Sequence, residues 1–237
     1  KRVYDAHELF TEMKEVVVRP RIYAIWKWIE SFFVPLFKMG YTVNEPIKNI
    51  LAQKYKVDYK VIQNVPFRTT YNEVKKENFI IYQGAVNEGR SFETLIPAFQ
   101  WIDMELWIFG EGNFMQQAQD LAKEYKVEDK IKFKGALLPY HLKETTPKAL
   151  LGITLFENKG LSNYFSLANR FFDYIQSGVP QLCVDYPVYR HINEEYEVAV
   201  LITDLSPENI AQKINQTLAD PQKMALMKQN CQKAAQV

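Results

Sequence analysis

The sequence predicts an α/β fold in which a parallel β-sheet is covered by helices on both faces. The first observation behind this prediction is the alternation, from Phe79 onward, of short apolar runs with longer segments of helical periodicity. Strands and helices that alternate in this way form parallel sheets, because each helix returns the chain to the start of the next strand. The second observation is a content of 47% hydrophobic and 24% charged residues, which is ordinary for a globular protein.

The elements from Phe79 onward can be assigned in order. Strands are expected over the apolar runs 79–82, 106–109, 131–133, 151–156, 179–184 and 199–202. Helices are expected from Phe92, from Asn113, over 139–148, from Ser166 to a stop at Gly178 and Pro180, near Val188, and over 206–218 and 221–235.

The chain before Phe79 carries fewer and shorter elements. Residues 1–10 are expected to be the end of a strand that leads into a polar loop. A helix is expected over 45–55, between the short apolar runs 41–43 and 61–62. The segment 68–78 is polar and lacks periodicity, which predicts a hinge.

A helix with a wide apolar face is expected within residues 19–39. Apolar and aromatic side chains recur there at helical spacing: Ile22, Tyr23, Ile25, Trp26, Trp28, Ile29, Phe32, Phe33 and Phe37. The interpretation that we favour is a helix packed in a core, which is the common position of such residues. An aromatic and partly basic helix can also lie on a membrane surface, and this interpretation stays open.

The net charge of +1 does not predict a nucleic-acid partner. The charge is nevertheless uneven, because residues 1–68 carry 12 Lys/Arg and 7 Asp/Glu (+5), whereas the remainder carries 17 and 21 (−4). A basic first part suits an acidic acceptor or an anionic membrane surface, and it is equally compatible with ordinary surface variation.

The two cysteines and the absence of targeting signals bear on the compartment. Cys183 and Cys231 provide neither a disulfide framework nor the spacing of a metal site, which is typical of a reducing compartment. No window of about 18 uncharged apolar residues predicts a membrane span. We therefore expect a cytoplasmic protein, with the inner face of the membrane as an alternative position. Because the sequence begins without Met and without a signal peptide, we expect that the start of the natural protein is missing.

The stretch from Gly160 to Pro180 contains the strongest functional pattern. Small and polar residues, Asn163 among them, precede a predicted helix that begins near Ser166 and Leu167. The free amides and the dipole at the start of a helix favour a phosphate group. Asp173 follows Ser166 by about two helical turns, so its carboxylate could accept hydrogen bonds from a ribose on the same side.

This stretch resembles the donor-binding motif of the retaining GT-B glycosyltransferases called family 4. The family reads roughly S-L-P-N-K-L-F-E-Y and then G-x-P, and this chain reads SLANRFFDY over 166–174 and then GVP. Ala168 replaces Pro, Arg170 replaces Lys, and Asp173 replaces the second Glu of the family's E-x7-E pair. Phe165 stands where the first Glu of that pair would fall, so this acid is absent.

The resemblance extends to three loops that follow predicted strands, where ligands of parallel sheets bind. The loop with Gly84 and Arg90 is similar to the family's Y-x-G-x-x-x-x-x-R loop, whose base faces the donor diphosphate, and Arg170 would supply a second charge. The loops at 110–112 and 133–135 are similar to segments that the family places around the nucleotide. The donor-binding residues expected in this way are Gly84, Arg90, Gly110, Gly112, Phe133, Gly135, Asn163, Ser166, Leu167, Arg170 and Asp173.

The first ten residues also resemble the family, through a D-x-H-E segment at 5–8. The likeness places His7 near the acceptor hydroxyl or the donor sugar, and His7 and Arg90 are the residues that we expect to take part in catalysis. Imidazole can bind sugar hydroxyls and titrates near neutral pH. A histidine hydrogen-bonded to the backbone at a strand end is the alternative.

The resemblance implies a GT-B fold of two Rossmann-like domains. Residues 1–67 would be the C-terminal part of an incomplete acceptor-binding domain, 68–78 the hinge, and 79–237 the nucleotide-sugar domain. The implied function is retaining transfer of a sugar from a UDP- or GDP-sugar to a glycan or a lipid-linked saccharide, as in polysaccharide biosynthesis. No metal and no other cofactor are expected, and the incomplete chain could be inactive.

Other functions are left open by the same residues. A non-catalytic nucleotide-sugar-binding module is compatible with Phe165 at the position of the family's first Glu. A sugar-nucleotide 2-epimerase shares the fold but needs additional cleft acids and histidines that are not found. A dehydrogenase is disfavoured, because G-x-G-x-x-G with an acid about twenty residues further on is absent.

Overall fold

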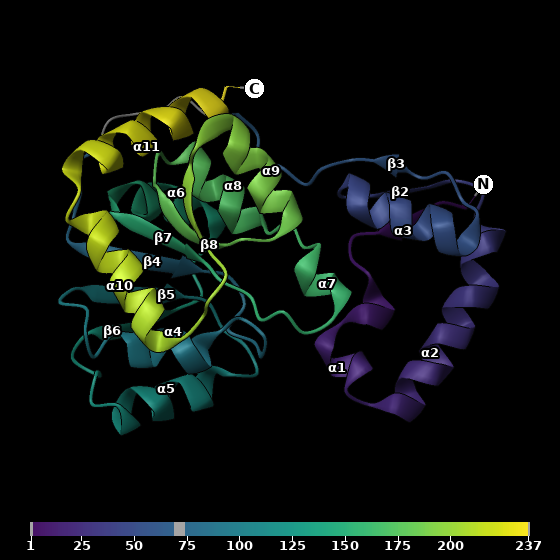
Figure 1. Cartoon of the computed structure of the whole chain (residues 1–237), viewed down its shortest axis with the longest axis horizontal. Coiled ribbons are helices and arrows are strands. Elements are labelled where there is room, and N and C mark those ends of the chain that lie inside the picture. Colours follow the sequence, from purple (N-terminus) through teal and green to yellow (C-terminus); the bar gives the residue numbers. More distant parts are fainter. Residues whose placement is uncertain (1, 69–73, 237) are drawn as a thin grey trace. The chain divides into compact units, whose positions relative to one another are not determined.

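The computed structural model describes residues 2–68 and 74–236, which fold into two compact units (Figure 1). Unit 1 comprises the chain up to Val65 together with Glu157–Leu167 and Tyr186–Val188. Unit 2 comprises the remainder. Residues 157–167 are therefore packed with unit 1, although they connect a strand and a helix of unit 2. The predicted hinge at 68–78 lies in part outside the described residues and stays a prediction.

Unit 2 is built on a parallel sheet with the strand order β6-β5-β4-β7-β8-β9. This order is that of a doubly wound fold, in which the chain starts in the middle of the sheet and proceeds outward in both directions. The direction changes between β4 and β7, which pair at Ile80 and Leu151. The strands are β4 (Phe79–Gln83), β5 (Glu105–Phe109), β6 (Ile131–Gly135), β7 (Leu151–Thr154), β8 (Gln181–Val184) and β9 (Ala199–Ile202).

Helices cover both faces of this sheet (Figure 1). On one side α4 contacts both α5 and α10, and elsewhere α8 contacts α11. All five residues of β4 are buried, as expected for a strand between two helical layers. The helices are α4 (Phe92–Ala98), α5 (Met115–Glu124), α6 (Pro139–Thr145), α8 (Asn169–Gln176), α9 (Pro187–Tyr196), α10 (Pro207–Leu218) and α11 (Pro221–Ala234), with the 3₁₀ turn η3 (Thr146–Lys148).

Unit 1 contains a smaller parallel sheet with the order β1-β2-β3. Its core includes Ile47 and Leu51 from the helix α3 and Tyr59, all buried. Asn44 caps α3, because its side chain accepts a hydrogen bond from the amide of Ile47 at 3.0 Å. The elements are β1 (Tyr4–Ala6), β2 (Gly40–Thr42), β3 (Lys60–Val61), α1 (Lys14–Val17), α2 (Pro20–Phe33), α3 (Glu45–Tyr55) and α7 (Leu161–Tyr164), with the 3₁₀ turns η1 (Phe10–Glu12) and η2 (Val34–Leu36).

The predicted fold class is confirmed, because both units are parallel sheets with helices. The helix expected within 19–39 is present as α2 and η2, but the favoured position of this helix in a core is wrong. No residue of α2 is buried. Large apolar side chains of α2 are exposed instead, among them Trp28 and Phe32 with 67% and 57% of their surface accessible.

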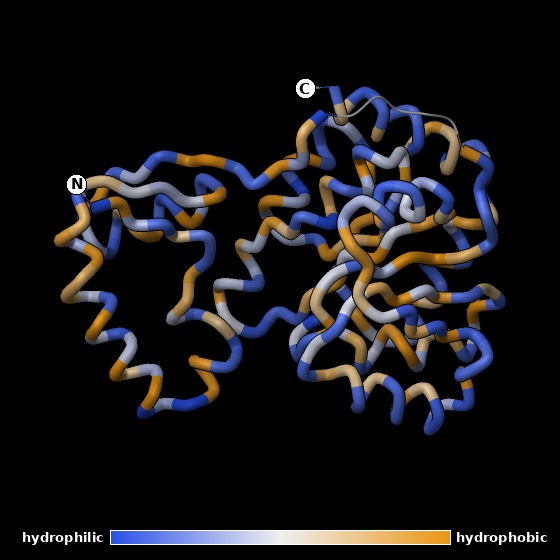
Figure 2. Tube along the Cα trace, turned by 180° about the vertical axis from the view of Figure 1, so that it is seen from behind, coloured by the Kyte–Doolittle hydropathy of each residue, from blue (hydrophilic) through white to orange (hydrophobic). Residues whose placement is uncertain are grey.

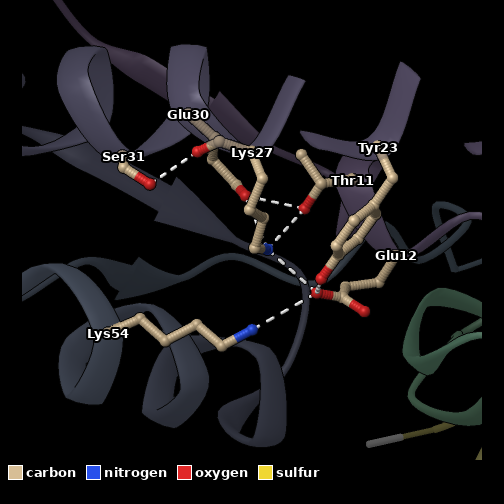
Figure 3. A network of polar contacts seen from close by, with 7 residues as sticks. All are labelled: Thr11, Glu12, Tyr23, Lys27, Glu30, Ser31 and Lys54. Atoms are coloured by element: carbon tan, nitrogen blue, oxygen red, sulfur yellow. Dashed lines mark hydrogen bonds and ion pairs between the residues drawn. The ribbon is translucent and has the colours of Figure 1, made fainter. Parts of the chain in front are cut away.

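The polar side of α2 faces the rest of unit 1 (Figure 3). Lys27 donates hydrogen bonds to Thr11 at 2.7 Å, to Glu12 at 2.9 Å and to Glu30 at 2.8 Å. Glu12 also pairs with Lys54 of α3 at 3.3 Å. These ion pairs have side chains that are largely covered, so they stabilise α2 in its observed orientation more than fully exposed pairs would.

Proton equilibria reflect this network. Burial alone would raise the pKa of Glu12, but the hydrogen bond and charge of Lys27 and the charge of Lys54 outweigh it and hold the pKa below its ordinary value. Burial would likewise lower the pKa of Lys27, and the hydrogen bonds and charges of Glu30 and Glu12 raise it above its ordinary value instead. Both groups are therefore held in their charged forms.

None of the described helices combines the length and the apolar character that a membrane span requires.

Candidate functional site

The candidate site lies in unit 2, at the carboxyl ends of β4, β5 and β6, beside the point where the strand order changes direction. The amide of Gly84 donates to Phe109 at 2.9 Å, and the amide of Gly110 donates to Gly135 at 2.9 Å, so the three glycine loops are joined by backbone hydrogen bonds. A Cβ atom at Gly110 would lie 1.8 Å from the carbonyl oxygen of Gly84. Close contact between loops therefore explains this glycine.

Gly112 and Gly135, two further predicted glycines, differ in how closely neighbouring atoms would approach a Cβ atom. A Cβ atom at Gly112 would lie 2.2 Å from the carbonyl oxygen of Val86, so this glycine is also required by loop packing. Gly135 has a φ of +69°, and no heavy atom would lie within 4 Å of a Cβ atom there. Gly135 consequently leaves open space at the end of β6, next to the predicted base-binding residue Phe133, which is half-buried.

Arg170 is a buried cation at the start of α8, with 7% of its surface exposed. Its guanidinium donates to the hydroxyl of Tyr82 at 3.2 Å and to the carbonyl of Leu155 at 3.5 Å, whereas Nε is buried without a hydrogen-bond partner. Within residues 2–68 and 74–236 no carboxylate forms an ion pair with Arg170. A buried cation that lacks an anion is costly, and a bound anion would offset that cost.

The guanidinium of Arg90 approaches the same place from the loop after β4. Its central carbon lies 4.6 Å from the centre of the Phe156 ring, and that of Arg170 lies 4.6 Å from the same ring. Arg170 also lies 4.6 Å from the ring of Tyr82. Two guanidinium groups around one aromatic ring create a positive region, and each presents a planar array of donors that suits phosphate oxygens.

Gly84 leaves the room that Arg170 occupies. Its φ of +126° is unfavourable for side-chain-bearing residues, and a Cβ atom there would lie 3.2 Å from a terminal nitrogen of Arg170. From the sequence we expected Gly84 and Arg90 in one loop and Arg170 as a second charge beside them. The structure shows Arg170 beside Gly84 and both guanidinium groups against Phe156.

Asp173 lies one turn after Arg170 on α8 and meets the end of β4. Its carboxylate accepts a hydrogen bond from Gln83 at 2.9 Å, and Gln83 accepts one from Thr146 at 2.7 Å. Burial raises the pKa of Asp173 above its ordinary value, and the hydrogen bond from Gln83 and the charge of Lys143 offset only part of that rise.

Asp173 lines a cavity of about 490 Å³ within unit 2. Its walls are largely apolar, with Asp173, Gln83 and Thr146 among the polar groups. The remaining lining residues are Pro66, Phe67, Val74, Pro139, Leu142, Lys143, Glu144, Pro147, Gln176 and Ser177. Apolar walls with a few convergent polar groups are typical of small-molecule sites.

The predicted helix start at Ser166 is wrong, because α8 begins three residues later at Asn169. The amide of Ser166 donates to the carbonyl of Asn163 at 3.1 Å, which closes the short helix α7 instead. Ala168 then adopts an extended conformation before α8. The free amides expected at Ser166 and Leu167 are consequently not those of a helix start.

Asn163 and His7, two further predicted site residues, lie in unit 1, as does Phe165. The side-chain amide of Asn163 donates to the carbonyl of Glu157 at 3.3 Å. Phe165 packs against the hydrophobic core of unit 1, and its carbonyl accepts a hydrogen bond from Asn44 at 2.7 Å. His7 is more than half exposed, and its Nδ1 lies 2.5 Å from the carboxylate of Asp5. The structure thus gives Phe165 a packing role where the family has an acid.

Three residues of the site were not predicted, namely Tyr82, Phe156 and Gln83. Each stands at or just beyond the end of an apolar run, and this position is the feature of the sequence that could have indicated them as site residues. Among the described residues, no group of three or more His, Cys, Asp or Glu side chains is arranged to hold a metal ion.

Comparison with known families identifies the class of protein. The family described as "Glycosyl transferases group 1" matches residues 66–234. The chain therefore belongs to the group 1 glycosyl transferases. A comparison with curated protein sequences found no significant match.

Solved structures support the same GT-B fold. Anabaena HepE in complex with UDP and glucose has a TM-score of 0.78 at 14% identity, covering 98% of this chain and 66% of its own. WaaG, a glycosyltransferase involved in lipopolysaccharide biosynthesis, has a TM-score of 0.74 at 14% identity, with 99% and 70% covered. TarM of S. aureus has a TM-score of 0.69 at 15% identity, with 89% and 42% covered. The chain thus spans between 42% and 70% of these proteins.

Proposed function

We propose that the protein transfers a sugar from a nucleotide-diphospho-sugar to a glycan or a lipid-linked saccharide. The observation that carries this proposal is the pair of guanidinium groups, Arg90 and Arg170, around Phe156 in a chain of the group 1 glycosyl transferases. A leaving diphosphate carries negative charge that grows as the glycosidic bond breaks. Cations that are already in position stabilise that charge without reorganisation during the reaction.

The parts of the donor have separate proposed positions. Arg90 and Arg170 bind the diphosphate, together with the first free amides of α8, which replace those predicted at Ser166 and Leu167. Asp173 accepts hydrogen bonds from the ribose, and the base lies along Phe133 and Gly135. The glycines at 84, 110 and 112 shape the loops around the diphosphate.

His7 and Asn163 have a proposed role toward the sugar. The imidazole of His7 binds a hydroxyl near the reacting carbon, and Asn163 holds another hydroxyl of the donor sugar. Retention of the anomeric configuration follows from the resemblance to the retaining family. We expect no dedicated metal ion, because the guanidinium groups take the place of a divalent cation at the diphosphate.

UDP is the nucleotide that we favour over GDP, because HepE is described in complex with UDP and glucose. A lipid-linked or polysaccharide acceptor is supported by WaaG, which is described as involved in lipopolysaccharide biosynthesis. We propose a cytoplasmic position at the inner face of the membrane, where such acceptors are assembled.

A panel of nucleotides tests this function through thermal stabilisation of the protein. A ligand that binds only the folded state raises the melting temperature, by an amount that grows with concentration over Kd. UDP and UDP-sugars are expected to raise it, GDP-sugars less and NAD not at all. Stabilisation by NAD alone would contradict the proposal.

A non-catalytic donor-binding module is the second candidate, favoured by Phe165, which packs against the core of unit 1 at the position of a family acid. Release of UDP from UDP-glucose, with and without added acceptor saccharides, separates the two. Donor binding without release of UDP in the full-length protein would favour the binding module. An epimerase would instead convert the donor to a second sugar without consuming an acceptor.

A further inference from the structure

Gln83 and Thr146 form a buried polar pair beside Asp173, the acid of the candidate site. Hydrophobic segments pass through the middle of unit 2 in Figure 2. Gln83 and Thr146 depart from that pattern, because both are polar and only 4% and 2% of their surfaces are exposed. Burying an amide or a hydroxyl costs free energy unless the group finds a hydrogen-bond partner. The partners of these two side chains therefore indicate what the pair does.

The hydroxyl of Thr146 fixes the orientation of the Gln83 amide. Oγ1 of Thr146 donates to Oε1 of Gln83 at 2.7 Å, and Nε2 at the other side of the amide donates to Oδ2 of Asp173 at 2.9 Å. Turning the amide over would bring Oε1 against the carboxylate, where neither oxygen has a hydrogen to donate. The three residues consequently form a hydrogen-bond chain with one direction, from η3 through the end of β4 to α8.

The backbone of Gln83 is held in place as well. Its amide N–H donates to the hydroxyl of Tyr174 at 3.2 Å, and this hydroxyl donates to the carbonyl of Ile81 at 3.1 Å. Tyr174 is fully buried in α8, one residue after Asp173. Gln83 is thus bonded to α8 through its backbone and to η3 through its side chain. Its Nε2 therefore presents a donor to Asp173 at a fixed position.

Asp173 has two carboxylate oxygens, and the hydrogen-bond chain uses one of them. Oδ2 accepts the bond from Gln83, whereas Oδ1 accepts no hydrogen bond from the residues that the structure describes. Asp173 is half-buried and lines the cavity of about 490 Å³. Because the lone pairs of a carboxylate lie in its plane, a bond that holds Oδ2 also restricts the directions from which Oδ1 accepts. The carboxylate is thus oriented before a ligand binds.

We propose that Gln83 and Thr146 are positioning residues, which orient the Asp173 carboxylate toward the hydroxyls of a ribose and thereby set the preference of the site for ribonucleotides over deoxyribonucleotides. This inference rests on the proposed function, in which Asp173 binds the ribose. A carboxylate that is already oriented loses little conformational freedom when the hydroxyls arrive. A nucleotide without these hydroxyls leaves the half-buried acceptor without donors, which weakens its binding.

Calorimetric titration with UDP, dideoxy-UDP and inorganic pyrophosphate tests this role. Dideoxy-UDP lacks both ribose hydroxyls, and pyrophosphate lacks the whole nucleoside. The protein is expected to bind UDP about tenfold or more tightly than dideoxy-UDP. Thr146→Val removes the hydroxyl at nearly constant volume, and it should reduce this preference to about threefold or less by weakening UDP. Gln83→Met, which removes the amide, should act in the same way. The Kd of pyrophosphate should stay unchanged in both variants.

Two further threonine variants serve as controls, and melting curves show that each variant is folded. Thr146→Ser keeps the hydroxyl and should retain most of the preference for UDP. Thr145→Val is the matched control, because the hydroxyl of Thr145 donates to the carbonyl of His141 at 2.9 Å in an exposed position. It should leave the preference as it is.

The outcomes separate this inference from the proposed function. A Thr146→Val variant that melts at a lower temperature but keeps the full preference for UDP would overturn the inference, because the pair would then only stabilise the fold. Equal affinity of the unaltered protein for UDP and dideoxy-UDP would overturn it as well, while leaving sugar transfer in place. Failure of all these ligands to bind would overturn the proposed function together with the inference.

Discussion

The helices α8 and α2 are both amphipathic and aromatic, yet they direct their apolar sides in opposite ways. In α8, Phe171 and Tyr174 are fully buried, whereas α2 has no buried residue. The difference follows from the partners of their polar sides. In α8 the polar groups Arg170 and Asp173 reach the end of β4 and the candidate site, and in α2 Lys27 and Glu30 bind Thr11 and Glu12. Periodicity therefore defines a face, and the surrounding partners decide its direction.

The largest expected effect is a difference in the free energy of unfolding between variants of one phenylalanine from each helix. Phe171→Ala should lower the free energy of unfolding by about 3–5 kcal/mol, because it leaves a cavity in the core of unit 2. Phe32→Ala should change it by less than about 0.5 kcal/mol, because the ring is mostly exposed. Urea denaturation followed by circular dichroism measures both. Similar losses for the two variants would show that α2 is covered in solution.

A smaller effect is expected from the network that orients α2. Glu12→Gln should cost about 1–3 kcal/mol at pH 7, because Lys27 and Lys54 lose their charged acceptor. The pKa of Glu12 is lowered in the folded state, so its contribution is present above the ordinary carboxyl pKa and is lost as the pH falls through the folded value. Glu15→Gln, an exposed acid of α1, is the control. A difference that persists unchanged at acid pH would exclude this charge as the cause.

The smallest effect, of opposite sign, is expected for the buried acid of α8. Asp173→Asn should stabilise the protein at pH 7 by on the order of 1 kcal/mol, because it removes a charge that burial disfavours. The pKa of Asp173 is raised, so the acid favours folding only at low pH and this contribution is lost as the pH rises through the folded value. The advantage of the Asn variant should therefore shrink on acidification. Melting curves from pH 4 to 8 measure this, with Asp129→Asn as the exposed control.

The alternation of apolar runs and helices was sufficient to predict the six strands of unit 2, because buried parallel strands are short and almost wholly apolar. The start of α8 was placed three residues early. Ser166 is a common helix-capping residue, and only the hydrogen bond from its amide to Asn163 shows that it ends α7 instead. The direction of α2 could not be predicted, because its polar side is held by Thr11 and Glu12, which lie 15 to 19 positions away from their partners Lys27 and Glu30.

Single residues of the site were easier to predict than their contacts. Gly84 and Arg90 could be named because the loop after a parallel strand is where ligands bind. The contact of Arg90 and Arg170 with the ring of Phe156 could not be predicted, because it brings together a loop, a strand end and a helix that are distant in sequence. Gly110 and Gly112 were predicted as nucleotide-binding residues, and the structure adds a reason of its own, which is contact between adjacent loops.

The central claim is that Arg90 and Arg170 bind the diphosphate of a nucleotide sugar, and calorimetric titration with UDP tests it most directly. Arg90→Ala should weaken binding about tenfold to a hundredfold, because a charge-assisted contact to phosphate is lost. Lys123→Ala, which removes an exposed cation from α5, should leave Kd unchanged. An unchanged Kd for Arg90→Ala, or equal losses for the two variants, would contradict the account.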